Sequence, residues 1–256
     1  MPISIGFWDI LLVAVVSIQA TVLAYLYDPR LKAFVLTLPF PFTVASLAVG
    51  RPLDATNILG LILLLMFAHM VRLLHVNLHV NIIVSIALSA LIYCVIGTAM
   101  ARLVPNTPAV FWGAVVLTVV VALVLVTVLP HRHERGHRSP LPIWIKLPII
   151  IGVVLFLVLI KNGLRGFMTV FPMVTVIACY EARNSLWAIG RQIPILMLTM
   201  TPMMLAIRIA QSQLHLRIGL SLVAGWVVFL TGLAITIRFR RPSYQRPDAT
   251  GSPGAG

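Results

Sequence analysis

The chain has 256 residues; 60% of them are hydrophobic, only 10% are charged, and the formal net charge is +13. Soluble domains carry about 25% charged residues, so this composition excludes a soluble domain and indicates a helical membrane protein that crosses the bilayer many times. In such a protein the positive charge lies mostly in cytoplasmic loops that face anionic membrane lipids, and it does not imply nucleic acid as a partner.

The sequence predicts nine membrane-spanning helices, because apolar runs of about 20 residues are long enough to cross the hydrocarbon core. In chain order they cover residues 5–26, 31–50, 56–75, 80–103, 109–129, 142–160, 164–182, 186–209 and 215–237. Pro39 and Pro172 interrupt the second and the seventh, so each of these is either a broken span or a re-entrant hairpin. We also expect a basic cytoplasmic loop at 131–141 and a disordered cytoplasmic tail at 238–256.

The distribution of Lys and Arg decides between these alternatives and sets the orientation. With all nine segments crossing and the stretch HRHERGHR on the cytoplasmic side, 13 Lys and Arg lie inside and six lie outside. With two re-entrant hairpins the numbers become seven inside and 12 outside. We therefore expect nine full crossings, with the N-terminus outside and the C-terminus in the cytoplasm.

Two distant stretches share a pattern: LKAFVLTLPFPF at 31–42 and LRGFMTVFPMVT at 164–175. With the constant offset that sets Leu31 beside Leu164, spans one to four fall on spans six to nine, and span five is left as a connector. Five crossings separate equivalent spans, so the second copy has the opposite orientation. The sequence thus predicts a first membrane repeat at 1–105, a connecting helix at 106–130 and a second, inverted repeat at 142–237, which is an architecture typical of transporters.

The paired residues of these stretches are the first candidates for a substrate site. Lys32 and Arg165 lie at span entrances, where they either extend to the lipid headgroups or flank a path for an anion. Pro39 and Pro172 each remove a backbone donor, which produces either a packed kink or a lined cavity. Three further cations near span ends support an anion site: Arg183, Arg191 and Arg208.

Other polar groups near span ends have two interpretations each. Glu181 is either an interfacial ion-pair partner or a protonatable coupling site. His75 and His79 form either a polar turn or, with Arg208 at the position equivalent to His75, a cationic lining at both span ends. The six acids are at least 19 residues apart and none lies near these histidines, so we expect no metal site, no cofactor and no catalytic residue.

The stretch GFMTVFPMVTVIACYEA at 166–182 resembles the GlpM-like family of small inner-membrane proteins. The matching positions are Gly166, Phe171, Pro172, Ala178 and Tyr180. The resemblance covers about residues 164–209, and the first repeat departs from it with Ala33 and Leu38. It implies a location in the bacterial inner membrane and a connection to exopolysaccharide production, and it supplies no catalytic residues.

Three hypotheses of function follow. The leading one is a small transporter or flippase for an anionic substrate, either a phosphate-bearing lipid carrier or a small soluble anion. The alternative is a non-transporting integral subunit of an envelope polysaccharide or lipid export machine, and assembly as a homodimer or with a membrane complex partner stays open. A membrane enzyme that uses His75, His79 or Glu181 ranks third.

Neutral replacement of both Lys32 and Arg165 should reduce transport more than neutral replacement of Arg240 and Arg241, because only the first pair lies at span entrances. Uptake into vesicles that hold equal amounts of each variant measures the difference. An equal loss in the two double variants would contradict the assignment of Lys32 and Arg165 to the substrate path.

Overall fold

The computed structural model describes residues 6–26, 31, 35–130, 148, 151–152 and 164–239, with the side chains of Arg165 and of 236–239 excepted. These residues form eight α-helices and no strand, as the all-α prediction requires. The helices are α1 (Phe7–Tyr25), α3 (Phe40–Val49), α4 (Ala55–Arg72), α5 (Ile82–Leu103), α6 (Pro108–Val128), α8 (Met173–Glu181), α9 (Leu186–Ser212) and α10 (Ile218–Phe239). A π-helical turn, η1 (Leu73–Asn77), extends α4, and a 3-10 helix, η2 (Arg165–Val170), precedes α8.

Six of these helices are long and apolar enough to cross a membrane: α1, α4 with η1, α5, α6, α9 and α10. They coincide with the predicted first, third, fourth, fifth, eighth and ninth spans, which supports a multi-pass membrane protein. Nearly all of the predicted sixth span at 142–160 lies outside the described residues, as do the basic loop at 131–141 and the tail from residue 240 onward.

The predicted second and seventh spans each contain a short helix that starts at a proline. Pro39 is the N-cap of α3 with φ −83° and ψ 30°, and Pro172 is the N-cap of α8 with φ −70° and ψ 42°. Proline has no backbone N–H, and its ring clashes with the carbonyl four residues earlier, so an α-helix cannot continue through it undisturbed. Both interruptions therefore fall at the predicted prolines and have nearly the same backbone geometry.

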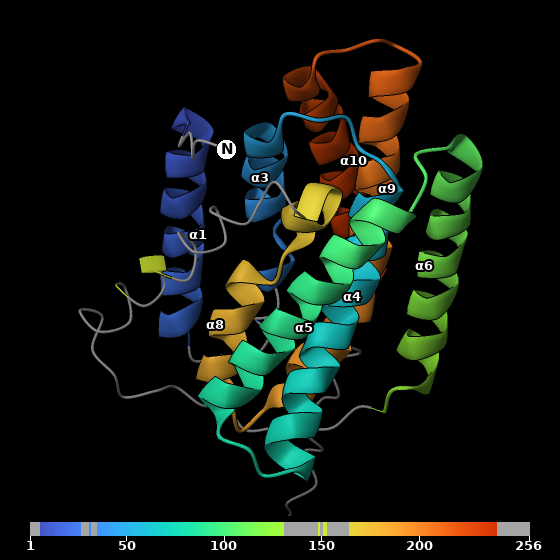
Figure 1. Ribbon diagram of the computed structural model, residues 1–256. Coiled ribbons are helices and arrows are strands. Elements are labelled where there is room, and N and C mark those ends of the chain that lie inside the picture. Colours follow the sequence, from blue (N-terminus) through green and yellow to red (C-terminus); the bar gives the residue numbers. More distant parts are fainter. Residues whose placement is uncertain are drawn as a thin grey trace, which may run out of the picture.

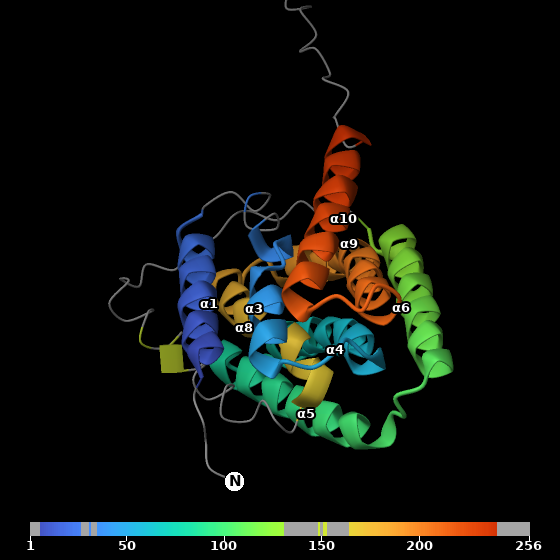
Figure 2. The ribbon, with the colours of Figure 1, turned by 90° about the horizontal axis from the view of Figure 1, so that it is seen from above.

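The long helices α4 and α9 form the centre of the bundle and run in opposite directions (Figure 1). The short helices α3 and α8 also run oppositely to each other, and so do α5 and α10 (Figure 1). Seen from above, α1, α5, α6 and α10 surround α3, α4, α8 and α9 (Figure 2). In the long spans, 56% of residues are buried in α4 and in α9 but only 22% in α10, so the outer helices leave most of their aliphatic side chains to lipid.

The 3-10 helix η2 packs directly on the first turn of α4. A Cβ placed on Gly166 would collide with Thr56 Oγ1 and lie 2.7 Å from Asn57 Oδ1. Only glycine lets the two backbones approach this closely. The contact joins residues that are far apart in the chain and fixes the segment before Pro172 against the first half of the protein.

Replacing Gly166 with Ala should destabilise the protein by about 1–3 kcal/mol, because the added methyl group forces η2 away from α4. Unfolding of the detergent-solubilised protein measures the loss. The matched control is Gly113→Ala in α6, where a Cβ meets no atom within 4 Å and where the higher helix propensity of Ala favours the folded state. A Gly166→Ala variant as stable as the control would contradict the close approach.

Candidate functional site

The interruption before α3 is stabilised by a buried side chain from α1. Pro39 frees the carbonyl of Val35, and in an apolar surrounding this group needs a partner. Gln19 Nε2 donates to Val35 O at 2.7 Å and to Leu38 O at 3.3 Å. Gln19 is only 6% exposed. The first broken span is thus a packed interruption whose freed carbonyl is bound by protein.

The interruption before α8 is stabilised by α4 and α5 instead. The fully buried Tyr93 donates its hydroxyl to Phe167 O at 2.9 Å, and its ring lies edge-on to Phe171 at 4.9 Å. Asn57 Nδ2 donates to Thr169 Oγ1 at 2.9 Å, and Thr169 Oγ1 donates to Gly166 O at 2.7 Å. These side chains connect the first half of the chain to the segment that precedes Pro172.

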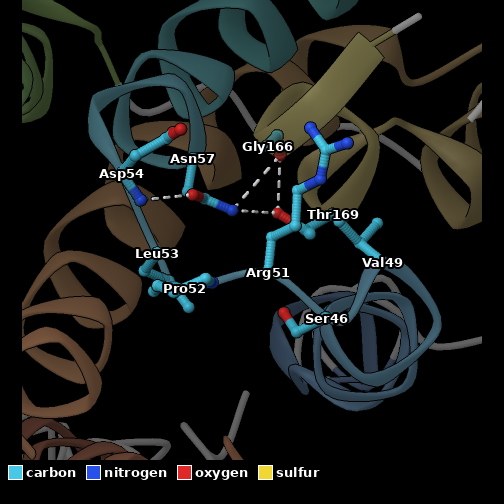
Figure 3. Close-up of a pocket in the computed structure, with 9 residues that line it drawn as sticks. All are labelled: Ser46, Val49, Arg51, Pro52, Leu53, Asp54, Asn57, Gly166 and Thr169. Atoms are coloured by element: carbon cyan, nitrogen blue, oxygen red, sulfur yellow. Dashed lines mark hydrogen bonds between the residues drawn. The ribbon is translucent and has the colours of Figure 1, made fainter. Parts of the chain in front are cut away.

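A small polar cavity of about 20 Å³ lies beside this hydrogen-bonded cluster (Figure 3). Its walls come from the end of α3, the loop to α4, the first turn of α4 and η2. The lining residues are Ser46, Val49, Arg51, Pro52, Leu53, Asp54, Asn57, Gly166 and Thr169. A cavity of this size has room for about one water molecule or one small ion, and it is too small for a phosphate group or a lipid.

Two arginines occupy reciprocal positions on the central helix pair. Near the end of α9, Arg208 Nη1 donates to Leu53 O at 2.8 Å, just before α4 begins, and its guanidinium lies 5.5 Å from the centre of the Phe111 ring. At the end of α4, the Arg72 guanidinium lies 4.3 Å from the ring of Trp187, in the first turn of α9. Each long helix therefore presents an arginine to the start of the other, at opposite ends of the bundle.

The turns that follow α4 and α9 also match each other. His79 in the first turn and His215 in the second have positive φ of 54° and 49°. Each turn closes with the same kind of backbone bond, from Val80 N to Leu74 O at 2.9 Å and from Leu216 N to Ala210 O at 3.1 Å. In both turns this bond reaches back six residues, one more than the corresponding bond of a Schellman C-cap, and encloses a residue of positive φ.

Aligning these turns gives a different offset between the two halves from the one used in the sequence comparison. The constant offset that sets Leu31 beside Leu164 places Arg208 opposite His75, whereas aligning the two turns places Arg208 opposite Arg72. The reason is that α9 has 27 residues while α4 with η1 has 23, so the register changes within the helix. His75 and His79 do not share a helical face, because His79 has left-handed backbone geometry and follows the end of the helix.

The predicted site residues do not form one cluster. Lys32 lies outside the described residues, and Arg165 begins η2. Both Pro39 and Pro172 are buried at the interruptions. The remaining predicted residues divide between the ends of α9, with Arg208 at one end and Glu181, Arg183 and Arg191 at the other.

The group at the start of α9 is partly buried. Glu181, the last residue of α8, is only 1% exposed, and Arg183 and Arg191 are half-buried. The Arg183 guanidinium lies 5.7 Å from the Tyr180 ring. Among the described residues, no three His, Cys, Asp or Glu side chains are placed to hold a metal ion.

Four polar residues that the fold brings into the interior or to the helix ends were not predicted as site residues: Ser46, Asn57, Arg72 and Thr169. Arg72 was only one of the 13 Lys and Arg expected on the cytoplasmic side. The signal available for the other three was the presence of a single amide or hydroxyl in an otherwise apolar run. The sequence alone does not show that these three residues lie together; the contact between η2 and α4 does.

Replacing Tyr93 with Phe should destabilise the protein by about 1–3 kcal/mol, because the carbonyl of Phe167 loses its hydroxyl partner in a buried position. Thermal or denaturant unfolding in detergent measures the difference. The control is Thr127→Val in α6, which removes an exposed hydroxyl that bonds only to carbonyls of its own helix. Equal stability of the two variants would show that Tyr93 does not stabilise the second interruption.

Comparisons of the chain with protein-family models, with curated proteins and with solved structures found no match. The resemblance to the GlpM-like family therefore stays a prediction from residues 166–182.

Proposed function

We propose that the protein is a small membrane transporter or flippase for an anionic substrate, built from two inverted repeats around the α4 and α9 pair. The observation that carries the proposal is the pairing of α3, α4 and α5 with α8, α9 and α10, each helix opposite in direction to its counterpart (Figure 1). Inverted repeats with interrupted helices are a recurring architecture of secondary transporters, with substrate bound where the repeats meet.

Three features support the internal relationship. The short helices begin at prolines with similar dihedral angles, the long helices end in turns with the same hydrogen bond, and Arg72 and Arg208 make reciprocal contacts. Under this proposal the counterpart of α1 lies at 142–160, which brings the count to nine spans. Two similar halves of opposite orientation can exchange their conformations, and this exchange would open the path to one membrane face and then to the other.

The arginines favour an anionic substrate. A guanidinium has five N–H donors and binds phosphate or carboxylate through two of them. Arg208 uses one donor on Leu53 O, and Arg72 stacks on Trp187, so each guanidinium is held in place while further donors face outward from that contact. We assign Arg72 and Arg208 to the binding path at opposite ends, together with Lys32 and Arg165 at the span entrances.

Single Arg72→Gln and Arg208→Gln variants should each lower transport by about tenfold or more, because a charge-assisted hydrogen bond contributes about 1.5–3 kcal/mol. Vesicles containing the purified protein are assayed with radiolabelled phosphate for a soluble anion and with a fluorescent phosphatidic acid for lipid flipping. The matched control is Arg102→Gln at the exposed end of α5.

Loss in Arg72→Gln and Arg208→Gln but not in Arg102→Gln supports the path, and the probe that responds identifies a soluble or a lipid anion. Equal losses in all three variants would contradict it. A wild-type protein that moves neither probe and co-purifies stably with another membrane protein would replace the transporter proposal with the subunit of an export machine.

A further inference from the structure

The cavity beside η2 contains a buried hydroxyl that has no hydrogen-bond partner. Ser46 is 2% exposed, and its Oγ makes no hydrogen bond. In Figure 3 this oxygen points from α3 toward the side of the cavity formed by Asn57 and Thr169. A buried polar group without a partner lowers the stability of the folded state. A ligand in the adjoining cavity that bonds to this hydroxyl would remove that cost.

Beside the donors of Arg51 and the Asn57 amide nitrogen, the cavity lining offers several oxygen acceptors. Thr169 Oγ1 already donates its proton to Gly166 O and accepts from Asn57 Nδ2, so it presents a remaining lone pair. Asn57 Oδ1 accepts from Asp54 N at 2.8 Å and also retains a lone pair. These are neutral oxygen ligands of the kind that hard metal cations prefer.

The end of α3 adds negative potential at the same place. Ser46 O accepts from Gly50 N at 3.0 Å, but no described donor reaches the carbonyls of Leu47, Ala48 and Val49. Unpaired carbonyls at a helix C-terminus carry the negative end of the helix dipole and favour a cation within the last turn. Half-helix ends of this kind coordinate sodium ions in transporters with broken helices.

The charged residues around the cavity decide the valence of the ion. Asp54 is the only carboxylate among the lining residues, and it accepts hydrogen bonds from Thr56 N and Thr56 Oγ1 as the N-cap of α4. The exposed Arg51 is the one basic side chain among the lining residues, so the lining carries no net charge. A divalent ion requires more carboxylate ligands than this, and a space of about 20 Å³ admits only one small ion.

We propose that this cavity binds one monovalent alkali cation, with sodium as the probe, through Ser46 Oγ, Thr169 Oγ1, Asn57 Oδ1 and the end of α3. The ligands belong to both halves of the chain, so the bound ion stabilises the contact between η2 and α4. If the transporter proposal holds, the ion is the coupling ion, and its occupancy favours the conformation in which η2 is packed on α4. Binding itself does not depend on that proposal.

The first test measures binding without transport. Thermal unfolding of the full-length protein in detergent is followed while sodium chloride replaces choline chloride at constant ionic strength. A ligand that binds only the folded state raises the unfolding temperature in a saturable way. The wild type should show this rise, and Ser46→Ala should require about tenfold more sodium for the same rise, since it loses one oxygen ligand.

The matched control is Ser17→Ala in α1, which removes another buried hydroxyl without a partner at a position outside the cavity. It should respond to sodium as the wild type does. Neither Ser→Ala variant breaks a hydrogen bond, so both should fold, with unchanged or higher stability in choline chloride. Arg51→Gln should lower the sodium concentration needed, because it removes a like charge from the mouth of the cavity.

Three results would overturn the site: no response to sodium in the wild type, an equal response in wild type and Ser46→Ala, or a response abolished by Arg51→Gln. The last result would show that Arg51 is needed for the response, whereas a like charge beside a cation site should weaken it. The coupling role is tested separately in vesicles. An inward sodium gradient should accelerate uptake of the anionic probe by the wild type but not by Ser46→Ala. If sodium raises the unfolding temperature but the vesicles take up neither phosphate nor phosphatidic acid, the transporter proposal fails and the cation site still stands.

Discussion

The structure depends on one constraint: in an apolar surrounding every backbone N–H and C=O must find a partner inside the protein. The six long helices meet it within themselves, but the prolines at 39 and 172 prevent the second and seventh segments from doing so. The two interruptions have nearly the same backbone geometry at the proline, but different side chains bind their backbone carbonyls. Gln19 of α1 binds the freed carbonyl before α3, whereas Tyr93 and Asn57 bind the segment before α8.

The two ends of the central helix pair are also joined by different side chains. Hydrogen bonds between distant parts of the chain gather where α4 begins and α9 ends, through Asn57, Leu53, Arg208 and Gln211. At the other end of the same helix pair, Arg72 lies on the face of Trp187. Trp187 Nε1 also donates to Pro130 O at 3.1 Å, so hydrogen bonds join distant parts of the chain at both ends of the pair.

Much of the fold could be predicted from the sequence, because hydropathy is a local property and six apolar runs appear as long helices. Proline acts locally as well, so the starts of α3 and α8 followed from single residues. The register between the halves could not be obtained in this way, since a constant offset does not detect the greater length of α9. Arg72 was therefore not compared with Arg208, and Ser46, Asn57 and Thr169 come together only through a contact between segments that are far apart in the chain.

The cavity residue Ser46 has no chemical equivalent in the second half of the chain. With the offset that aligns Pro39 and Pro172, Ser46 corresponds to Cys179. Cys179 is buried and offers a soft thiol, not the hard oxygen ligand that an alkali cation prefers. Under the transporter proposal, a cation beside Ser46 would stabilise only one of the two conformations that the halves exchange, so the sequence difference between the halves would make the two membrane faces inequivalent.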